Sequence, residues 1–198
     1  MEKRIDFRIL QQSPDFKVPK PELEQYTTPP DIVIEIVKQA YTLGHLDGTV
    51  ADLGCGTGRL AIGAALTGAE VTGYEIDMEA LDLAKNYSDA QKLNIKWINS
   101  AIENIEEKYD TVLMNPPFGA QVAGADRSFL QNALRIARNI WSIHIVQTKR
   151  FIENFIEKNR GEVISAYEFD FPIKKTMPFH IKESKNEKAI LYHIASLQ

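Results

Sequence analysis

The stretch Asp52-Leu53-Gly54-Cys55-Gly56-Thr57-Gly58 decides the fold of this 198-residue chain, because it joins a buried strand pattern to a helical one. The run from Thr49 to Leu53 predicts a strand, and the small residues from Arg59 to Leu66 predict a helix that packs closely against a sheet. Glycines at such a junction let the backbone approach a ligand, and the free N–H groups of a helix N-terminus attract an anionic group. The stretch therefore predicts a ligand-binding turn inside an α/β unit.

Further along the chain, apolar runs of strand length alternate with stretches of 3.6-residue periodicity. We expect strands at residues 71–75, 96–99, 110–114 and 142–146, and helices at residues 31–43, 78–92, 127–139 and 149–158. Two strand patterns, 162–171 and 188–197, then follow each other without a helix between them, and we expect these to pair as an antiparallel hairpin. This order predicts an α/β fold with an open, mostly parallel sheet and helices on both faces.

The length and composition are typical of one globular domain over residues 1–198, with residues 1–30 as an N-terminal extension. No apolar run reaches the roughly 20 residues that cross a bilayer, and the start lacks a secretory apolar segment, so we expect a cytoplasmic protein with no membrane partner. A single cysteine and four histidines without i, i+4 pairing predict no structural metal.

The glycine loop differs from that of a dinucleotide site. A third glycine in G-x-G-x-x-G spacing would fall at Arg59 or Ala61, depending on which glycine starts the count. Asp52 instead precedes the glycines at the end of the strand, where a carboxylate suits an ammonium group. The loop therefore favours a ligand that carries an amino acid over one that carries a pyrophosphate.

Glu75 ends the next predicted strand, 23 positions after Asp52. A carboxylate at this distance can accept hydrogen bonds from both hydroxyls of a ribose. A helix cap is the alternative role, but Asp77 immediately precedes the next helical pattern and suits that role better. We therefore expect Glu75 to bind a ribose.

Asn115-Pro116-Pro117-Phe118 follows the predicted strand at residues 110–114. The two prolines restrict the backbone, so the Asn115 side chain and the Pro116 carbonyl can be held as two fixed acceptors. Two fixed acceptors suit the two hydrogens of a conjugated amine, and Phe118 offers an aromatic face to a planar substrate. The tetrapeptide would also suit a plain turn, but its place after the glycine loop and Glu75 favours a catalytic site.

Charge is spread unevenly along the chain, whose formal net charge is −4. Residues 145–198 hold nine lysines and arginines against seven acidic residues, including Lys149, Arg150, Lys174 and Lys175. We expect the last two to lie in a short loop bracketed by Pro172 and Pro178. Such a stretch can follow a phosphate backbone, although a solvated surface shows the same pattern.

Taken together, these motifs resemble a class I S-adenosylmethionine-dependent methyltransferase. With the segment Leu23 to Pro29 and the segment Gly124 to Leu130, they resemble the archaeal and eukaryotic methyltransferase-like protein five family, which methylates N6 of an adenosine in small-subunit ribosomal RNA. The resemblance covers essentially the whole chain. It implies a Rossmann-like fold with a seven-stranded sheet, S-adenosyl-L-methionine as cofactor, an RNA substrate, and a small zinc-protein activator as a further partner.

The resemblance also implies roles for individual residues. The N-terminal extension would cover the cofactor site, with Tyr26 and Thr28 over the methionine end. The catalytic residues would be Asn115, Pro116, Pro117 and Phe118, and the cofactor would contact Tyr26, Thr28, Asp52, Gly54, Cys55, Gly56, Thr57, Gly58, Glu75, Ile76, Ser100, Ala101 and Asn115. Two positions depart from the family: Thr27 replaces a proline, and Ala101 replaces an aspartate that reaches the adenine, so Ser100 or a backbone group would take over that contact.

Other functions fit the same motifs. A glutamine-directed protein methyltransferase uses a similar Asn-Pro-Pro sequence, and a guanine N2 methyltransferase of ribosomal RNA also fits. A cofactor-binding RNA scaffold without turnover is the alternative outside the enzymes. The intact Asn115 and Phe118 favour an enzyme, and the segment from Leu23 to Pro29 favours adenine.

Overall fold

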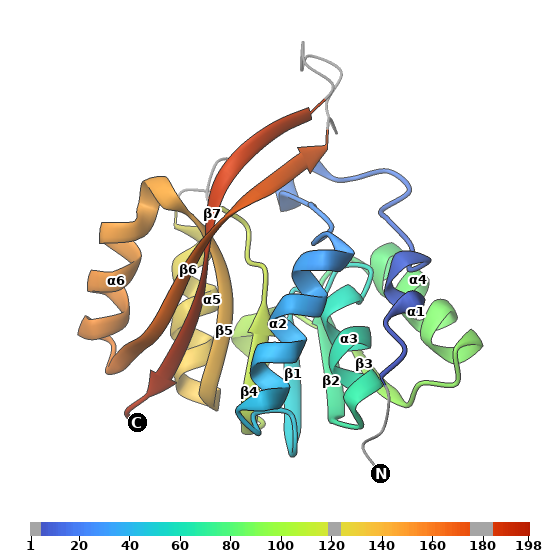
Figure 1. Ribbon diagram of the computed structural model, residues 1–198, viewed down its shortest axis with the longest axis horizontal. Coiled ribbons are helices and arrows are strands. Elements are labelled where there is room, and N and C mark those ends of the chain that lie inside the picture. Colours follow the sequence, from blue (N-terminus) through green and yellow to red (C-terminus); the bar gives the residue numbers. More distant parts are fainter. Residues whose placement is uncertain (1–4, 119–123, 175–183) are drawn as a thin grey trace.

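The computed structural model describes residues 5–118, 124–174 and 184–198. Seven strands form one sheet in the order β3-β2-β1-β4-β5-β7-β6 (Figure 1). Strands β1 to β5 run parallel, and β7 pairs antiparallel with both β5 and β6. The strands are β1 (Thr49–Leu53), β2 (Glu70–Glu75), β3 (Ile95–Asn99), β4 (Tyr109–Met114), β5 (Ala137–Ile145), β6 (Gly161–Lys174) and β7 (Ser184–Ser196).

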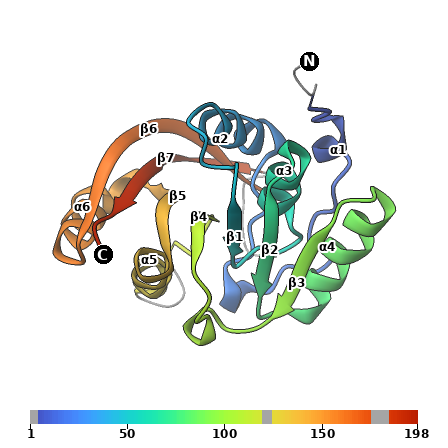
Figure 2. The ribbon, with the colours of Figure 1, turned by 90° about the horizontal axis from the view of Figure 1, so that it is seen from below.

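Helices cover both faces of the sheet, with α2 and α3 against one face and α5 against the other (Figure 2). The helices are α1 (Arg8–Gln11), α2 (Pro30–Thr42), α3 (Arg59–Thr67), α4 (Met78–Ala90), α5 (Ala125–Ile136) and α6 (Lys149–Lys158), with short 3₁₀ turns η1 (Pro21–Leu23), η2 (Ile102–Asn104) and η3 (Val146–Thr148). The predicted α/β fold, with its mostly parallel sheet and C-terminal hairpin, is confirmed.

The core divides into two layers because strand side chains alternate between the faces of a sheet. In β4, Leu113 packs into the layer shared with α2 and α3, whereas its neighbours Val112 and Met114 pack into the layer shared with α5 and α6. All three side chains are at most 1% exposed. Burial of β4 on both faces fixes the position of the residues that follow it at Asn115.

One predicted boundary is wrong. The helical periodicity continues to Asn139, but α5 ends at Ile136 and the chain enters β5 directly at Ala137. Ala137 lies opposite Tyr109 of β4, and the side chain of Asn139 donates to the Asp110 carbonyl at 3.3 Å. The residues after Ile136 suit a helix as well as a strand, and their pairing with β4 decides in favour of the strand.

The expected loop between Pro172 and Pro178 also begins too early. β6 continues through Pro172, which lies opposite Asn186, and ends at Lys174. A proline is tolerated here because β6 is the edge strand of the sheet, where one side of the backbone has no strand to bond with. Pro178 and Lys175 lie outside the described residues.

Residues 12–28 run as an irregular segment with one 3₁₀ turn before α2 begins. The buried guanidinium of Arg59 anchors this segment. It donates to the carbonyls of Ser13 and Thr28, each at 2.9 Å, and to the Ser13 hydroxyl at 2.7 Å. In the described part of the chain, no helix is long and apolar enough to span a membrane.

Candidate active site

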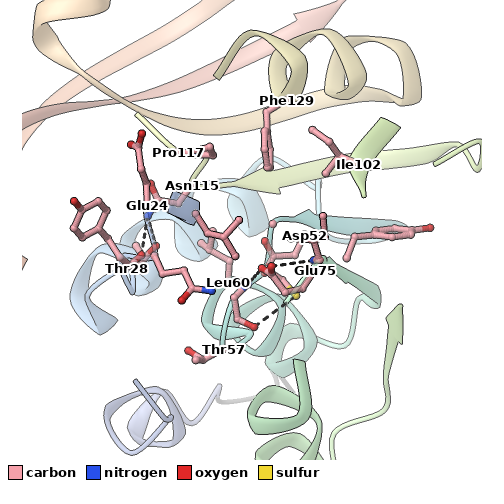
Figure 3. Close-up of a pocket in the computed structure, with 18 of the residues that line it drawn as sticks. Glu24, Thr28, Asp52, Thr57, Leu60, Glu75, Ile102, Asn115, Pro117 and Phe129 are labelled. Atoms are coloured by element: carbon pink, nitrogen blue, oxygen red, sulfur yellow. Dashed lines mark hydrogen bonds between the residues drawn. The ribbon is translucent and has the colours of Figure 1, made fainter. Parts of the chain in front are cut away.

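A cavity of about 350 Å³ lies at the carboxyl ends of β1, β2 and β4 (Figure 3). Its volume is within the range of small-molecule sites. The N-terminal segment 22–28, the glycine loop, residues 100–103 and the start of α5 complete its wall. Among the lining residues are Tyr26, Thr28, Asp52, Gly54, Cys55, Gly56, Thr57, Glu75, Ile76, Ser100, Ala101 and Asn115. The fold thus brings together twelve residues that the sequence assigns to a cofactor.

Gly58 is the remaining predicted cofactor residue, and its contact with the cofactor stays a prediction, while the structure shows how it packs. It caps α3 with φ of 83°, a left-handed conformation that favours glycine. A Cβ atom here would lie 2.5 Å from the ring of Trp97 and 2.8 Å from Cβ of Ala84. Gly58 therefore lets α3 start close to the layer formed by α4 and β3.

Cys55 packs beneath the glycine loop. Its backbone N–H donates to the Tyr74 carbonyl at 2.9 Å, and burial raises the pKa of its thiol well above the usual value. A thiol that stays protonated is a poor nucleophile. The residue is therefore a packing element of the loop.

Glu75 connects the glycine loop to the end of β2. Its Oε2 accepts from the Gly56 N–H at 2.7 Å, and its Oε1 accepts from the N–H groups of Ile76 and Asp77, each at 2.9 Å. A carboxylate offers about four acceptor positions, so Oε2 retains one. Burial raises the pKa of Glu75 from its ordinary value, while the three backbone donors act in the opposite direction.

Asp52 is buried beneath the cavity with one oxygen unpaired. Its Oδ2 accepts from the Ala61 N–H at 2.8 Å, which ties the end of β1 to the first turn of α3. Its Oδ1 has no hydrogen-bond partner among the described residues. Burial raises the pKa of Asp52 to about 7. A buried carboxylate oxygen without a partner is costly, so the site suits a cationic donor.

Asn115 follows β4 directly and is held by the N-terminal segment. Its Nδ2 donates to Thr28 Oγ1 at 3.0 Å and to the Tyr26 carbonyl at 3.5 Å. Its Oδ1 is buried and has no hydrogen-bond partner among the described residues. Pro116 is buried and Pro117 lines the cavity. The amide thus offers one free acceptor at the cavity wall.

Phe118 forms an aromatic pair with Tyr26. The two rings are stacked with centroids 6.3 Å apart and an interplanar angle of 15°. Phe118 also forms a T-shaped pair with Phe171 of β6, with ring centroids 6.0 Å apart. The Asn-Pro-Pro-Phe motif, the N-terminal segment and the C-terminal hairpin therefore meet at this ring.

Residues 100–103 form the wall next to Glu75. The Ser100 N–H donates to the Glu75 carbonyl at 3.0 Å, and its hydroxyl donates to the Ala101 carbonyl at 2.9 Å. Glu103, two positions beyond the alanine that replaces the family's aspartate, also lines the cavity. Glu103 is thus an acidic side chain in residues 100–103 of the wall, and no sequence motif predicted it.

Several more lining residues were not assigned to the site from the sequence, among them Phe16, Phe129 and Arg59. Phe16 covers the loop so closely that a Cβ atom on Gly56 would lie 2.6 Å from its ring. In the same way, a Cβ atom on Gly54 would lie 2.8 Å from the ring of Phe129. Arg59 stood out only as the residue in place of a third glycine. Long-range contacts of this kind leave no periodic signal in a sequence.

Two of the four predicted RNA-binding residues, Lys149 and Arg150, lie outside the set of residues that line the cavity. Lys149 begins α6 and forms an ion pair of 3.2 Å with Glu168 of β6, and Arg150 is exposed beside it. Lys174 is the last residue of β6, and its side chain is outside what the structure describes, as is the whole of Lys175. Their role in RNA binding remains a prediction.

Comparison with known proteins agrees with this geometry. Residues 31–171 match the Methyltransferase small domain family. The rRNA N(6)-adenosine-methyltransferase Mettl5 of Drosophila melanogaster is 36% identical, with 89% of this chain and 88% of that protein covered. METTL5 of Danio rerio is 37% identical, with 88% and 89% covered. A crystal structure of a candidate RNA methyltransferase from Pyrococcus horikoshii is 35% identical, with a TM-score of 0.91 and both chains fully covered. The chain therefore belongs to the Methyltransferase small domain family and is a class I S-adenosylmethionine-dependent methyltransferase of the METTL5 type.

Proposed function

We propose that the protein transfers a methyl group from S-adenosylmethionine to the N6 amino group of an adenosine in small-subunit ribosomal RNA. The observation that carries this function is the buried Oδ1 of Asn115, which has no partner among the described residues and lies at the cavity wall. An acceptor kept unpaired in a protein interior is satisfied by an incoming N–H donor. The names of the METTL5 relatives favour adenine as the carrier of that donor.

The cavity fits S-adenosylmethionine by the chemistry of its donor and acceptor groups. Asp52 Oδ1 is an unpaired anionic acceptor for the ammonium of the methionine part, and Oε2 of Glu75 has an acceptor position left for a ribose hydroxyl. Ile76, Ser100, Ala101 and Glu103 form the wall on the adenine side in this arrangement. Burial keeps these contacts out of water, where each is worth more than at the surface.

The cofactor supplies a methyl carbon bonded to a sulfonium, which an amine nitrogen can attack directly. The chain's own task is to hold that nitrogen. The adenine amine is a weak nucleophile because its lone pair is delocalised into the ring, and acceptors at Asn115 Oδ1 and the Pro116 carbonyl favour the pyramidal nitrogen that carries positive charge in the transition state. Alignment of this nitrogen with the methyl group supplies the remaining part of the rate acceleration. The target base must leave its stack to reach this site.

The rest of the chain supports the same function. We propose that residues 1–198 form a single domain, and that the extension up to Pro30 covers the bound cofactor, because its residues 22–28 line the cavity. We also propose that the protein works in the cytoplasm, that Lys149, Arg150, Lys174 and Lys175 contact RNA phosphates, and that a small zinc-protein activator assists it.

Methyl transfer from labelled cofactor tests the proposal. The substrates are small-subunit ribosomal RNA without the modification, and a release-factor peptide with a glutamine as rival, each with and without the activator. Labelled N6-methyladenosine, identified by mass spectrometry of nucleosides, is the expected product. Label in the peptide alone, or in guanine, would assign the enzyme to another substrate. Cofactor binding without any transfer would make the protein a scaffold.

A further inference from the structure

The side-chain amide of Asn115 is chemically asymmetric, so its orientation matters. Only the oxygen can accept a hydrogen bond from a substrate amine. If the amide were flipped, its two N–H donors would face the N–H donors of that amine. In the structure the NH₂ group points towards Thr28 and the Tyr26 carbonyl, and the oxygen points away from them. The carbonyl of Tyr26 can only accept, so it opposes the flipped orientation.

Thr28 supplies the shorter of these two hydrogen bonds. Its Oγ1 lies 3.0 Å from Asn115 Nδ2, against 3.5 Å for the Tyr26 carbonyl, and its side chain is buried at 5% exposure (Figure 3). A bond of 3.0 Å has normal strength, whereas one of 3.5 Å is weak. The Thr28 hydroxyl is therefore the stronger contact that holds the amide in place, while the Tyr26 carbonyl, which can only accept, selects the end that faces the cavity.

Thr28 is in turn held by Arg59. The Arg59 Nη1 donates to the Thr28 carbonyl at 2.9 Å, and the same guanidinium bonds to Ser13 and forms an ion pair of 3.0 Å with Asp15. The guanidinium side chain is only 8% exposed. On the other side of Thr28, the Pro29 carbonyl accepts from the Val33 N–H at the start of α2. The Thr28 carbonyl and the next carbonyl along the chain are therefore both held by hydrogen bonds.

We propose that Arg59 and Thr28 form a positioning relay that holds the Asn115 amide in place for catalysis, in the orientation that the Tyr26 carbonyl selects. Arg59 begins α3, the helix that follows the glycine loop, so the relay links the cofactor side of the cavity to the acceptor for the substrate amine. Neither residue touches the reacting atoms, and both act through Asn115. The catalytic part of this inference rests on the proposed function, whereas the hydrogen bonds themselves are independent of the substrate.

Thr28→Val removes the hydroxyl at constant shape and tests the relay. We expect kcat for methyl transfer, measured at saturating S-adenosylmethionine, to fall about tenfold, as loss of one buried hydrogen bond implies. Thr28→Ser keeps the hydroxyl and is expected to restore kcat to within about threefold of wild type. Thr111→Val is the matched control, because Thr111 is fully buried and its hydroxyl donates to the His45 carbonyl at 2.6 Å, near the opposite end of β4. It is expected to lower stability without changing kcat.

A second measurement needs no substrate. Nitrogen-15 NMR of the Asn115 side-chain amide, assigned by its loss in Asn115→Asp, follows hydrogen exchange of the NH₂ group with water. We expect slow exchange in the wild type and in Thr28→Ser, and exchange about tenfold faster in Thr28→Val. Equal exchange in all three proteins, or a Thr28→Ser variant as impaired in kcat as Thr28→Val, would overturn the relay. A wild type that methylates neither RNA nor peptide would instead refute the proposed function, and the exchange data would still decide the relay.

Discussion

At the scale of single residues, the site depends on two buried acceptors that the protein itself leaves unpaired. Asp52 Oδ1 and Asn115 Oδ1 both lack a partner among the described residues. Their residue types and their places, near the end of β1 and directly after β4, could be predicted from the sequence, since strand ends and glycine or proline neighbours are local features. What the sequence could not indicate is which oxygen remains unpaired, because that depends on Ala61, Thr28 and Tyr26.

Asp52 predicts a pH dependence of cofactor affinity. Burial raises the pKa of Asp52 to about 7, so the carboxylate becomes neutral as the pH falls below that value, and it then attracts the ammonium of the cofactor less. An α-amino group remains charged throughout this range. We expect affinity to fall about tenfold from pH 7 to pH 5.5, as one linked proton implies. Calorimetry should show a much flatter profile for Asp52→Asn, and a flat wild-type profile would contradict the assignment.

Asn115→Ala separates binding from chemistry. Removal of the acceptor should lower kcat about a hundredfold, as loss of a transition-state hydrogen bond does in comparable sites, while cofactor affinity stays within a few-fold. Steady-state kinetics and calorimetry on the same preparation measure the two effects. Equal losses in both would show that the residue supports the cavity instead of the reaction.

At the scale of elements, the junction of β1 and α3 shows why the position of this site could be predicted from the sequence. β1 and the start of α3 lie where the strand pattern and the glycine loop predict them. The boundary between α5 and β5 was missed because Ala137 fits the pattern of a helix and that of a strand equally well. Its pairing with Tyr109 of β4 places it in the strand. The early end assigned to β6 has the same origin, because Pro172 is acceptable only on an edge strand.

Gly58→Ala is expected to destabilise this junction by about 2–4 kcal/mol. The substitution combines a strained positive φ with a Cβ atom 2.5 Å from Trp97, whose ring is held by a hydrogen bond of 3.1 Å from its Nε1 to the Ser88 hydroxyl. Gly44→Ala is the control, because Gly44 also has a positive φ, of 73°, but its Cβ atom would meet only Asp47 Oδ2 at 3.3 Å. For Gly44→Ala we expect the free energy of unfolding to fall by about 1 kcal/mol. Urea unfolding of both variants measures the difference, and equal losses would exclude the packing contribution.

At the scale of the whole molecule, histidines buried in the sheet make folding sensitive to acid. His144 bonds to Ser142 at 2.7 Å, and burial lowers its pKa to about 3; His193 stacks on Trp141, and burial lowers its pKa to about 4. His144 is therefore a core residue, as its position inside a strand suggests. Both side chains take up protons more readily in the unfolded chain, so their contribution to stability is lost as the pH falls from about 6.5 towards 4.

The resulting slope can be measured. Between pH 6 and pH 5, each such histidine should lower the free energy of unfolding by up to about 1.4 kcal/mol per pH unit. Asp52 acts in the opposite direction, because its raised pKa makes the folded state lose stability as the pH rises from about 4 to 7. Chemical unfolding across this range should show a shallower slope for His144→Gln than for the wild type. An unchanged slope would mean that His144 is protonated in the folded protein.

RNA affinity is also a property of the whole surface. Reversal of Lys174 and Lys175 to glutamate should weaken RNA association and reduce its salt dependence, since each phosphate contact contributes roughly −0.9 (duplex) or −0.7 (single strand) to the log–log slope. Lys85→Glu, an exposed change on α4, serves as the control. Titrations over a salt series measure both effects, and an unaltered slope in the double variant would place the RNA elsewhere.

The order of strands in the sheet has a consequence for protein synthesis. β6 precedes β7 in the chain, yet β7 lies between β6 and the rest of the described sheet. On the ribosome, the 14 residues of β6 are therefore translated before the strand that pairs with them. In that interval the nascent chain carries unpaired backbone groups that can bind other chains. We expect chaperones to matter most for this protein after β6 has left the ribosome and before β7 has paired with it.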